Sequence, residues 1–183
     1  MRRIASIVLL IALVTLQSGC MLNFGGGIKA HADFTHTATW VADTPLLIDT
    51  RNGRIDVVQD GGSSGIEIAG RLTCVGKTEE EAADRLAAAT ISVEHDASGR
   101  LVIKPVFPDG ARGSDGASFS ITLPAGGEIE LISSNGSINT RSLSGMLTAT
   151  TSNGRIEVRE HDGSTKLRTS NGSITVMNLT GSS

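Results

Sequence analysis

Two acidic residues occupy equivalent positions in related stretches of the chain. Asp56 follows an isoleucine and has Arg54 two residues before it, and Glu157 follows an isoleucine and has Arg155 two residues before it. A pair of carboxylates can supply the acid and the base, or the acid and the nucleophile, of glycoside cleavage. The repeated setting favours a simpler interpretation, in which both side chains point outward from strands and pair with their neighbours. We therefore expect no catalytic residue and no enzyme.

The histidines and glycine-rich stretches do not form a ligand-binding pattern. His31 and His36 lie five residues apart, which is not the usual helical spacing of two metal ligands, and no cluster of Cys or Asp accompanies them. The stretch Gly61-Gly62-Ser63-Ser64-Gly65 lacks the lysine and the following helix of a phosphate-binding loop. Trp40 and four Phe, with no Tyr, are too few aromatic rings for a dedicated sugar-binding platform, which leaves only weak glycan binding by polar side chains. The sequence predicts no metal and no cofactor.

Cys20 could carry a covalent lipid. Arg2 and Arg3 precede an uncharged apolar run over residues 4–16, which gives way to Gln17-Ser18-Gly19-Cys20. This is the layout of a secretory signal peptide, and the apolar run is too short to span a bilayer comfortably. The small residues before the cysteine resemble the lipobox of bacterial lipoproteins, although Gln17 stands where such boxes usually have Leu. Ordinary secretory cleavage, which would leave Cys20 as a plain thiol, is the alternative.

Lipidation would divide the chain into three parts. Residues 1–19 are expected to be a signal peptide, residues 20–40 a lipid anchor and flexible tether, and residues 41–183 the folded domain. Met21 stands in place of the Asp that often marks inner-membrane retention, so an outer-membrane lipoprotein facing the periplasm or the cell surface is favoured. The formal net charge is −3, and removing Arg2 and Arg3 with the signal peptide makes it −5, which argues against nucleic-acid binding.

Cys74 is the only other cysteine. With Cys20 acylated, no intramolecular disulfide can form. The apolar neighbours Leu72 and Val75 indicate a buried strand residue that acts as a small hydrophobe. An intermolecular bridge is the alternative.

The elements that must position these residues follow a repeat. Glycine recurs every nine residues from position 127 to position 181, and apolar or Thr residues stand two and four positions after most of these glycines. The columns alternate with polar residues, which is the period of a strand with one buried face. The repeats therefore predict nine-residue units of one short strand and one corner. The columns are Ile129, Ile138, Leu147, Ile156, Thr165 and Ile174, followed by Leu131, Thr140, Ala149, Val158, Leu167 and Val176.

An Asn-Gly dipeptide marks every second corner. The predicted corners are Asn135-Gly136, Asn153-Gly154 and Asn171-Gly172, with an earlier copy at Asn52-Gly53. Glycine adopts positive φ without steric cost, and Asn tolerates it better than most residues. We therefore expect positive φ at these glycines, Gly154 among them.

Two all-β architectures satisfy the repeat. In a β-solenoid, eighteen residues make one coil of two strands and the Asn side chains stack in a ladder. In an antiparallel meander, each dipeptide is a two-residue hairpin turn. A solenoid covers its own apolar face, whereas a flat meander needs a cover that the C-terminal half does not supply, so the solenoid is favoured.

The middle of the chain is less regular. Thr78 and Glu81 form a capping box before one short inserted helix, whose apolar face carries Ala82, Leu86 and Ala89. Residues 108–116 are expected to form an exposed loop. Strands are expected over residues 46–49, 54–58, 65–74, 90–94 and 101–106, with a further alternating run from Phe119 to Leu123.

This order of segments resembles the bacterial putative-adhesin family, a domain of unknown function. The similarity covers about residues 40–181 and rests on Asn-Gly-x-Ile-x-Val from Asn52, the Glu- and Ala-rich helix, Phe119-Ser120-Ile121-Thr122-Leu123-Pro124 and the repeated Ser-Asn-Gly-x-Ile motif. The resemblance implies a β-solenoid-like repeat domain at the cell envelope. It assigns no catalytic residue, because that family has none established, and a shared fold is weak evidence for function.

Three functions are compatible with these features. The first is a non-catalytic envelope lipoprotein whose repeats serve adhesion or scaffolding. The second is a sensor or assembly factor that binds a protein through the edge of the repeats, and the third is an enzyme acting on a polysaccharide, which would need convergent acids and bases. The last strand of the array has no distinct cap, so we expect it either to pair with a partner, such as a second copy, or to fray.

Overall fold

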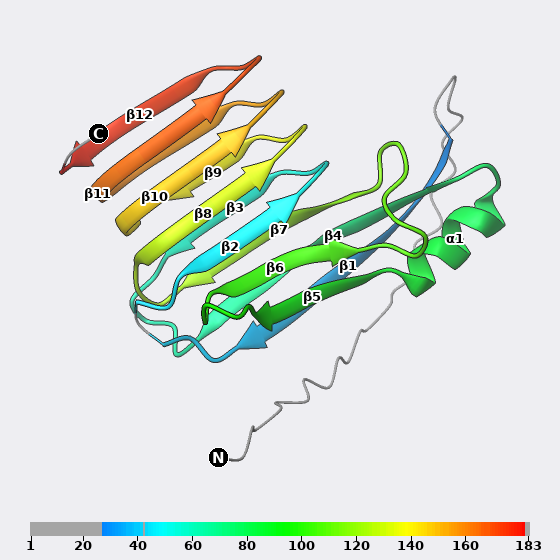
Figure 1. The fold of residues 1–183 in the computed structure, drawn as a ribbon, viewed down its shortest axis with the longest axis horizontal. Helices are drawn as coiled ribbons and strands as arrows, with labels where there is room; N and C mark the ends of the chain where they lie inside the picture. Colours follow the sequence, from blue (N-terminus) through cyan, green and yellow to red (C-terminus); the bar gives the residue numbers. More distant parts are fainter. Residues whose placement is uncertain (1–26, 42, 182–183) are drawn as a thin grey trace.

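The computed structural model describes residues 27–41 and 43–181, which form one twelve-stranded sheet and one helix (Figure 1). The all-β prediction with one short helix is confirmed. Neighbouring strands follow the order β1-β4-β7-β3-β9-β11-β10-β8-β2-β6-β5, and β12 lies beside β11. The elements are β1 (Ile28–Ala38), β2 (Leu46–Thr50), β3 (Ile55–Gln59), β4 (Ile66–Gly76), α1 (Glu79–Ala88), β5 (Thr90–His95), β6 (Leu101–Val106), β7 (Gly116–Leu123), β8 (Gly127–Ser133), β9 (Ile138–Arg141), β10 (Ser144–Thr151), β11 (Ile156–Thr169) and β12 (Ile174–Thr180).

The repeat strands pair in parallel. Ile156 aligns with Ile138 on one side and with Ile174 on the other, while Gly145 aligns with Gly127 and with Gly163. Every one of these partners is eighteen residues away. The antiparallel-meander interpretation is therefore wrong for the repeats, because a two-residue hairpin would pair its strands in the antiparallel sense.

Strand β11 joins the two layers of the curled sheet. Its residues 156–159 pair with β9, and its residues 162–169 pair with β10. Between the two halves, Glu160 adopts φ 53°. The two halves run in opposite directions, because β12 and β10 pair in parallel with one half each and point in opposite directions in Figure 1.

The core lies between the inner faces of the two layers. The predicted apolar columns are fully buried from Ile129 to Val158, which confirms the alternation. Burying one such side chain contributes about 1.5–3 kcal/mol. Burial decreases over the last two units: Thr165 and Leu167 are half-buried, Ile174 is 43% exposed and Val176 is 41% exposed.

The N-terminal half is mixed rather than repetitive. Strand β4 pairs in the antiparallel sense with both β1 and β7, and β5 pairs in the same sense with β6. Strands β2 and β3 join the repeats in parallel, with Ile55 beside Ile138 and Leu46 beside Ile129. The short Asn-Gly copy at Asn52 therefore lies in the same stack as the C-terminal repeats.

Helix α1 begins as the capping box predicts. The Thr78 Oγ1 accepts the Glu81 amide proton at 3.1 Å. The Glu81 carboxylate accepts from the Lys77 amide at 2.8 Å, one residue earlier than in the standard box. Ala82 is fully buried, and Leu86 and Ala89 pack against the core.

Two expectations for irregular segments are wrong. Residues 28–40 are not a flexible tether, because Ile28–Ala38 is strand β1 and Trp40 is buried. The alternation of inward Phe34 and His36 with outward Asp33 and Thr35 was hidden by the low hydrophobicity of the segment. The predicted signal peptide, Cys20 and the first part of the tether lie outside the described residues. The loop over 108–116 is not wholly exposed, because the Asp115 side chain is fully buried.

Candidate functional site

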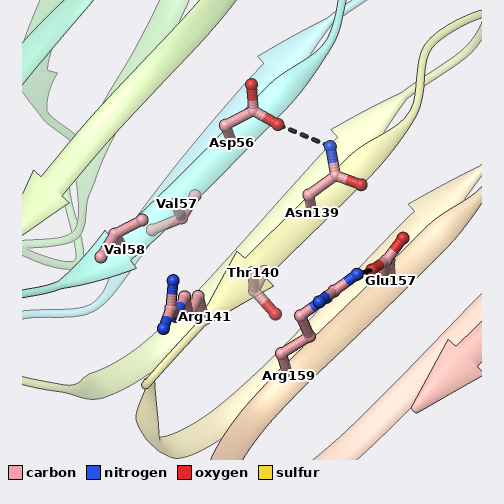
Figure 2. A pocket seen from close by; sticks show the side chains of 8 residues that line it. All are labelled: Asp56, Val57, Val58, Asn139, Thr140, Arg141, Glu157 and Arg159. Atoms are coloured by element: carbon pink, nitrogen blue, oxygen red, sulfur yellow. Dashed lines mark hydrogen bonds and ion pairs between the residues drawn. The ribbon is translucent and has the colours of Figure 1, made fainter. Parts of the chain in front are cut away.

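The parallel register brings Asp56 and Glu157 into one row on the outer face of the sheet. Asp56 of β3 aligns with Asn139 of β9, and Asn139 aligns with Glu157 of β11 (Figure 2). The two carboxylates are thus separated by one strand, which places them about 10 Å apart at the usual strand spacing. Asn139, which the sequence did not single out, occupies the place between them.

A second row lies two residues further along the same strands. It consists of Val58, Arg141 and Arg159, which also point outward (Figure 2). The two rows line a shallow hollow of about 410 Å³. An acidic row thus lies beside a basic row, because strand side chains of the same parity share a face.

The charges in the hollow are already paired. Asn139 donates its Nδ2 proton to Asp56 Oδ1 at 2.6 Å. Glu157 accepts from the Arg159 guanidinium and lies 3.6 Å from Arg155 Nη1. Arg141 Nε lies 3.3 Å from Glu160 Oε2. The two carboxylates face their own partners rather than a common point, which agrees with the surface-pairing interpretation.

A neighbouring hollow extends the same face toward β1. It is lined in part by Asp33, Arg54, Arg71 and Ser118, and it shares Asp56 with the first hollow. Arg71 donates two hydrogen bonds to the Asp33 carboxylate, at 2.7 and 3.1 Å. The hydrogen bond from Arg71 is the main cause of the lowered pKa of Asp33. We call the face formed by both hollows the charged strip.

The histidines do not assemble a metal site. His31 Nδ1 lies 2.9 Å from Thr73 Oγ1, and burial is the first cause that lowers the pKa of His31. His36 is on the opposite face of β1. His161 is buried at the turn inside β11, with neither ring nitrogen bonded to any described residue. Among the residues that the structure describes, no three His, Cys, Asp or Glu side chains are grouped for a metal ion.

The Asn corners form a hydrogen-bonded ladder. Each Asn donates its side-chain Nδ2 proton to the Oδ1 of the Asn one step earlier, from Asn171 to Asn153, Asn135 and Asn52, at 2.8–2.9 Å. Asn52 ends the ladder by donating to the carbonyl oxygens of Gly113 and Asp115, at 3.2 and 2.8 Å. The ladder is one-directional and is closed at its Asn52 end.

The corner glycines are required for a different reason than expected. Gly53 has φ 142°, but Gly136, Gly154 and Gly172 do not adopt positive φ, so that expectation is wrong for these three. A Cβ on Gly154 would lie 2.0 Å from the Gly136 carbonyl oxygen. The glycines thus allow stacked corners to approach closely. The positive-φ corners are the intervening ones at Gly145, Gly163 and Gly181.

Sequence reasoning missed a buried ion pair behind helix α1. Arg85 Nη2 lies 2.5 Å from Asp115 Oδ2, and the side chains are 6% and 0% exposed. Asp115 also accepts from the backbone amides of Val75 and Arg112, at 2.7 Å each. Arg85 stands on the same helix face as Ala82, but nothing in the sequence links it to an aspartate thirty residues away.

Cys74 is buried next to this ion pair, as its apolar neighbours predicted. Burial, followed by the negative charge of Asp115, raises the pKa of the thiol to about 11. The thiol is therefore protonated at neutral pH and shielded from solvent. An intermolecular disulfide through Cys74 would require this part of the fold to open.

Comparison with known proteins shows likeness in structure only. No protein-family model matches the chain, and no curated protein is similar to it. Among solved structures, a putative cell adhesion protein from Clostridium sporogenes is similar at 10% identity with a TM-score of 0.47, covering 84% of this chain and 97% of that one. A putative adhesin from Parabacteroides distasonis is similar at 12% identity with a TM-score of 0.40, covering 85% of this chain and 67% of that one. A putative adhesin from Bacteroides fragilis is similar at 12% identity with a TM-score of 0.29, covering 82% of this chain and 95% of that one.

These neighbours are all described as adhesion proteins, but at such identities the likeness assigns no role to any residue of this chain. Within the described ranges no helix has the length and apolar character needed to cross a membrane.

Proposed function

We propose that this protein is a non-catalytic cell-envelope lipoprotein whose β-repeat domain serves adhesion or scaffolding. Cys20 would carry the lipid and hold the protein at the outer membrane, with the charged strip available for contact. The shallow, open geometry of the charged strip is the observation that carries the proposal. A surface of paired charges suits contact with an extended polar partner better than it suits chemistry on a small substrate.

We further propose that the repeats are a β-solenoid built from nine-residue strand units, with eighteen residues in each coil. The parallel register at eighteen-residue intervals supports this architecture. The hydrogen-bonded Asn ladder supports it as well, because such a ladder forms only when the Asn corners of successive coils lie directly above one another. A stiff stack of this kind presents the same face along its length, which is the geometry of an extended binding surface.

A protein partner at the strand edge is the second candidate function, as in a sensor or an assembly factor. Strand β12 favours it, because Ile174, Val176 and Met177 are exposed at the end of the stack. A polysaccharide-acting enzyme has less support. Asp56 and Glu157 bind separate partners, and Asn139 lies between them. Their separation of about 10 Å at the usual strand spacing is wider than the roughly 6.5–9.5 Å between the carboxylates of inverting glycosidases.

The anchor is tested by substituting Cys20→Ser in the full chain. We expect the protein to move from the membrane fraction to the soluble fraction and to lose labelling by a fatty-acid analogue. Cys74→Ser is the matched control and should leave both properties unchanged. Unaltered labelling and fractionation of the Cys20→Ser protein would refute the lipid anchor.

The contact surface is tested with envelope fragments of the source cells on immobilised protein. Replacing Arg141 and Arg159 with Ser removes the basic row of the charged strip, and we expect retention of the fragments to fall severalfold. Lys104→Ser combined with Arg51→Ser removes the same charge from exposed positions outside the strip and should have little effect. Equal retention by both double variants would contradict a role for the strip.

A further inference from the structure

The C-terminal end of the stack has the shape of a step. Strand β12 covers the first half of β11 and the turn at Glu160, with Ile156 beside Ile174 and Asp162 beside Thr180. The second half of β11, residues 163–169, pairs with β10 on one side only. Among the described residues no strand covers the outer edge of β12 or the outer edge of residues 163–169. Strand β12 therefore extends one strand beyond residues 163–169, whose outer edge is left uncovered.

The straight part of the raised strand matches part of the uncovered stretch. Asn178 adopts φ 56°, as Glu160 does at the turn of β11, so β12 is straight over residues 174–177, and residues 166–169 of the uncovered stretch have the same length. The two halves of β11 run in opposite directions, and β12 runs with the first half. A two-fold rotation about an axis along the strands therefore places residues 174–177 of one molecule against residues 166–169 of a second copy, in the antiparallel sense. Two such contacts form at once, and both steps are filled.

We propose that two copies of this chain associate through this end, with residues 174–177 of each copy pairing with residues 166–169 of the other. This goes beyond the proposed function, because it depends neither on the lipid anchor nor on the charged strip. End-to-end alignment pairs Met177 with Lys166 of the second copy and Val176 with Leu167 of the second copy. In this register, inward residues meet inward residues and outward residues meet outward ones, as a continuous sheet requires.

The chemistry of β12 fits such a partner. Its sequence Ile-Thr-Val-Met-Asn-Leu-Thr contains no charge and no proline, so the strand lacks the usual devices that protect an edge from pairing. Val176, which is 41% exposed, would pack on Leu167 of the second copy and extend the core between the layers. Met177, which is 42% exposed, would lie over the aliphatic part of the facing lysine.

The other end of the molecule argues against head-to-tail stacking. The Asn ladder is closed there, because the Asn52 side chain donates to the carbonyls of Gly113 and Asp115. The outermost strands, β1 and β5, run antiparallel to their neighbours, so neither repeats the parallel edge that β12 leaves open. A second copy therefore meets its like end rather than the opposite one, which gives a closed two-fold dimer and no filament.

Disulfide trapping in the native envelope tests the pairing and its register. The full chain carries Met177→Cys together with Lys166→Cys, and mild oxidation should give a covalent dimer on a non-reducing gel. Each single variant is the control and should give little dimer, because the two-fold axis keeps like positions apart. Met177→Cys with Met146→Cys, in which Met146 is similarly exposed on β10, should also stay monomeric. A dimer yield no greater than in these controls would overturn the proposal.

Charge substitution gives a second measurement that does not depend on the cysteines. Sedimentation of the full chain in mild detergent should show a concentration-dependent dimer. Met177→Lys places like charges opposite one another at both contacts and should weaken the dimer about tenfold. Met177→Glu should instead preserve it, and Met146→Lys should leave it unchanged. A protein that is monomeric at all concentrations, or that binds only a strand of a different protein at this edge, would refute the dimer.

Discussion

The C-terminal repeats and the N-terminal half hold one sheet together by opposite means. In the repeats, many weak and identical contacts recur, such as the Asn ladder and the close approach of Gly154 to Gly136. In the N-terminal half, one buried ion pair between Arg85 and Asp115 fixes helix α1, the loop before β7 and strand β4 at a single point. The comparison shows that periodic structure spreads its stability over many residues, whereas irregular structure concentrates it in a few.

The largest effect is expected from breaking the ion pair. Asp115→Ala leaves the Arg85 guanidinium buried without its counter-charge, and we expect the free energy of unfolding to fall by about 3–5 kcal/mol. Chemical denaturation followed by far-UV circular dichroism measures the change. Asp33→Ala removes the exposed partner of Arg71 and serves as the control, since a solvent-exposed pair contributes little. A small loss for Asp115→Ala would show that the fold does not depend on this point.

A corner glycine should give an intermediate effect. In Gly154→Ala the new Cβ would lie 2.0 Å from the Gly136 carbonyl oxygen, so the stacked backbones must separate. We expect a destabilisation of about 1–3 kcal/mol. Gly62→Ala is the control, because no atom lies closer than 3.4 Å to its Cβ position and its φ is not in the positive region. Equal shifts of the two unfolding midpoints would contradict close stacking at the corner.

The Asn ladder should show a gradient along the repeats. Asn153→Ala removes two side-chain hydrogen bonds, to Asn135 and from Asn171, whereas Asn171→Ala removes only one. We expect a loss of about 1 kcal/mol for Asn153→Ala and roughly half of that for Asn171→Ala, measured in the same denaturation experiment. Identical losses at both positions would contradict a stability contribution that follows the number of ladder hydrogen bonds.

The sequence located most strands in both halves, but it predicted which strands pair only in the periodic region, for a physical reason. The alternation at Ile129, Leu147 and Ile156 is local information, since each strand repeats the pattern of its neighbour. The Arg85–Asp115 contact depends on how α1 packs against β4, which no local pattern specifies. Strand β1 was missed because its inward face is formed by Ala, Phe34 and His36 rather than by aliphatic residues. Asn139 was missed because only the parallel register places it between Asp56 and Glu157.

The smallest effect on stability is expected from the ionisation of Cys74, which lies in the irregular N-terminal half. Burial, and then the charge of Asp115, raises the thiol pKa from 9.0 to about 11. Because the folded state favours the protonated thiol, this contribution to stability is complete below pH 9 and is lost as the pH rises toward 11.

Alkylation by iodoacetamide measures the same property. At pH 8 we expect native Cys74 to react far more slowly than the unfolded chain, because the thiolate is the reactive form. The Asp115→Ala variant should react faster, since it loses one cause of the raised pKa and loosens the surroundings of the thiol. Equal rates for the native and unfolded chains would contradict a shielded thiol.

Native-state hydrogen exchange tests the central claim most directly, which is that the repeats are a parallel stack with an open end. Within the stack, the amides of Ile55, Ile138 and Ile156 each donate to the residue before the next isoleucine of the series, at 2.9 Å. No such bond is present for Ile174 among the described residues. In dilute protein we predict strong protection at Ile138, somewhat less at Ile156 and the least at Ile174. Equal protection at all of these amides, independent of concentration, would contradict the open end.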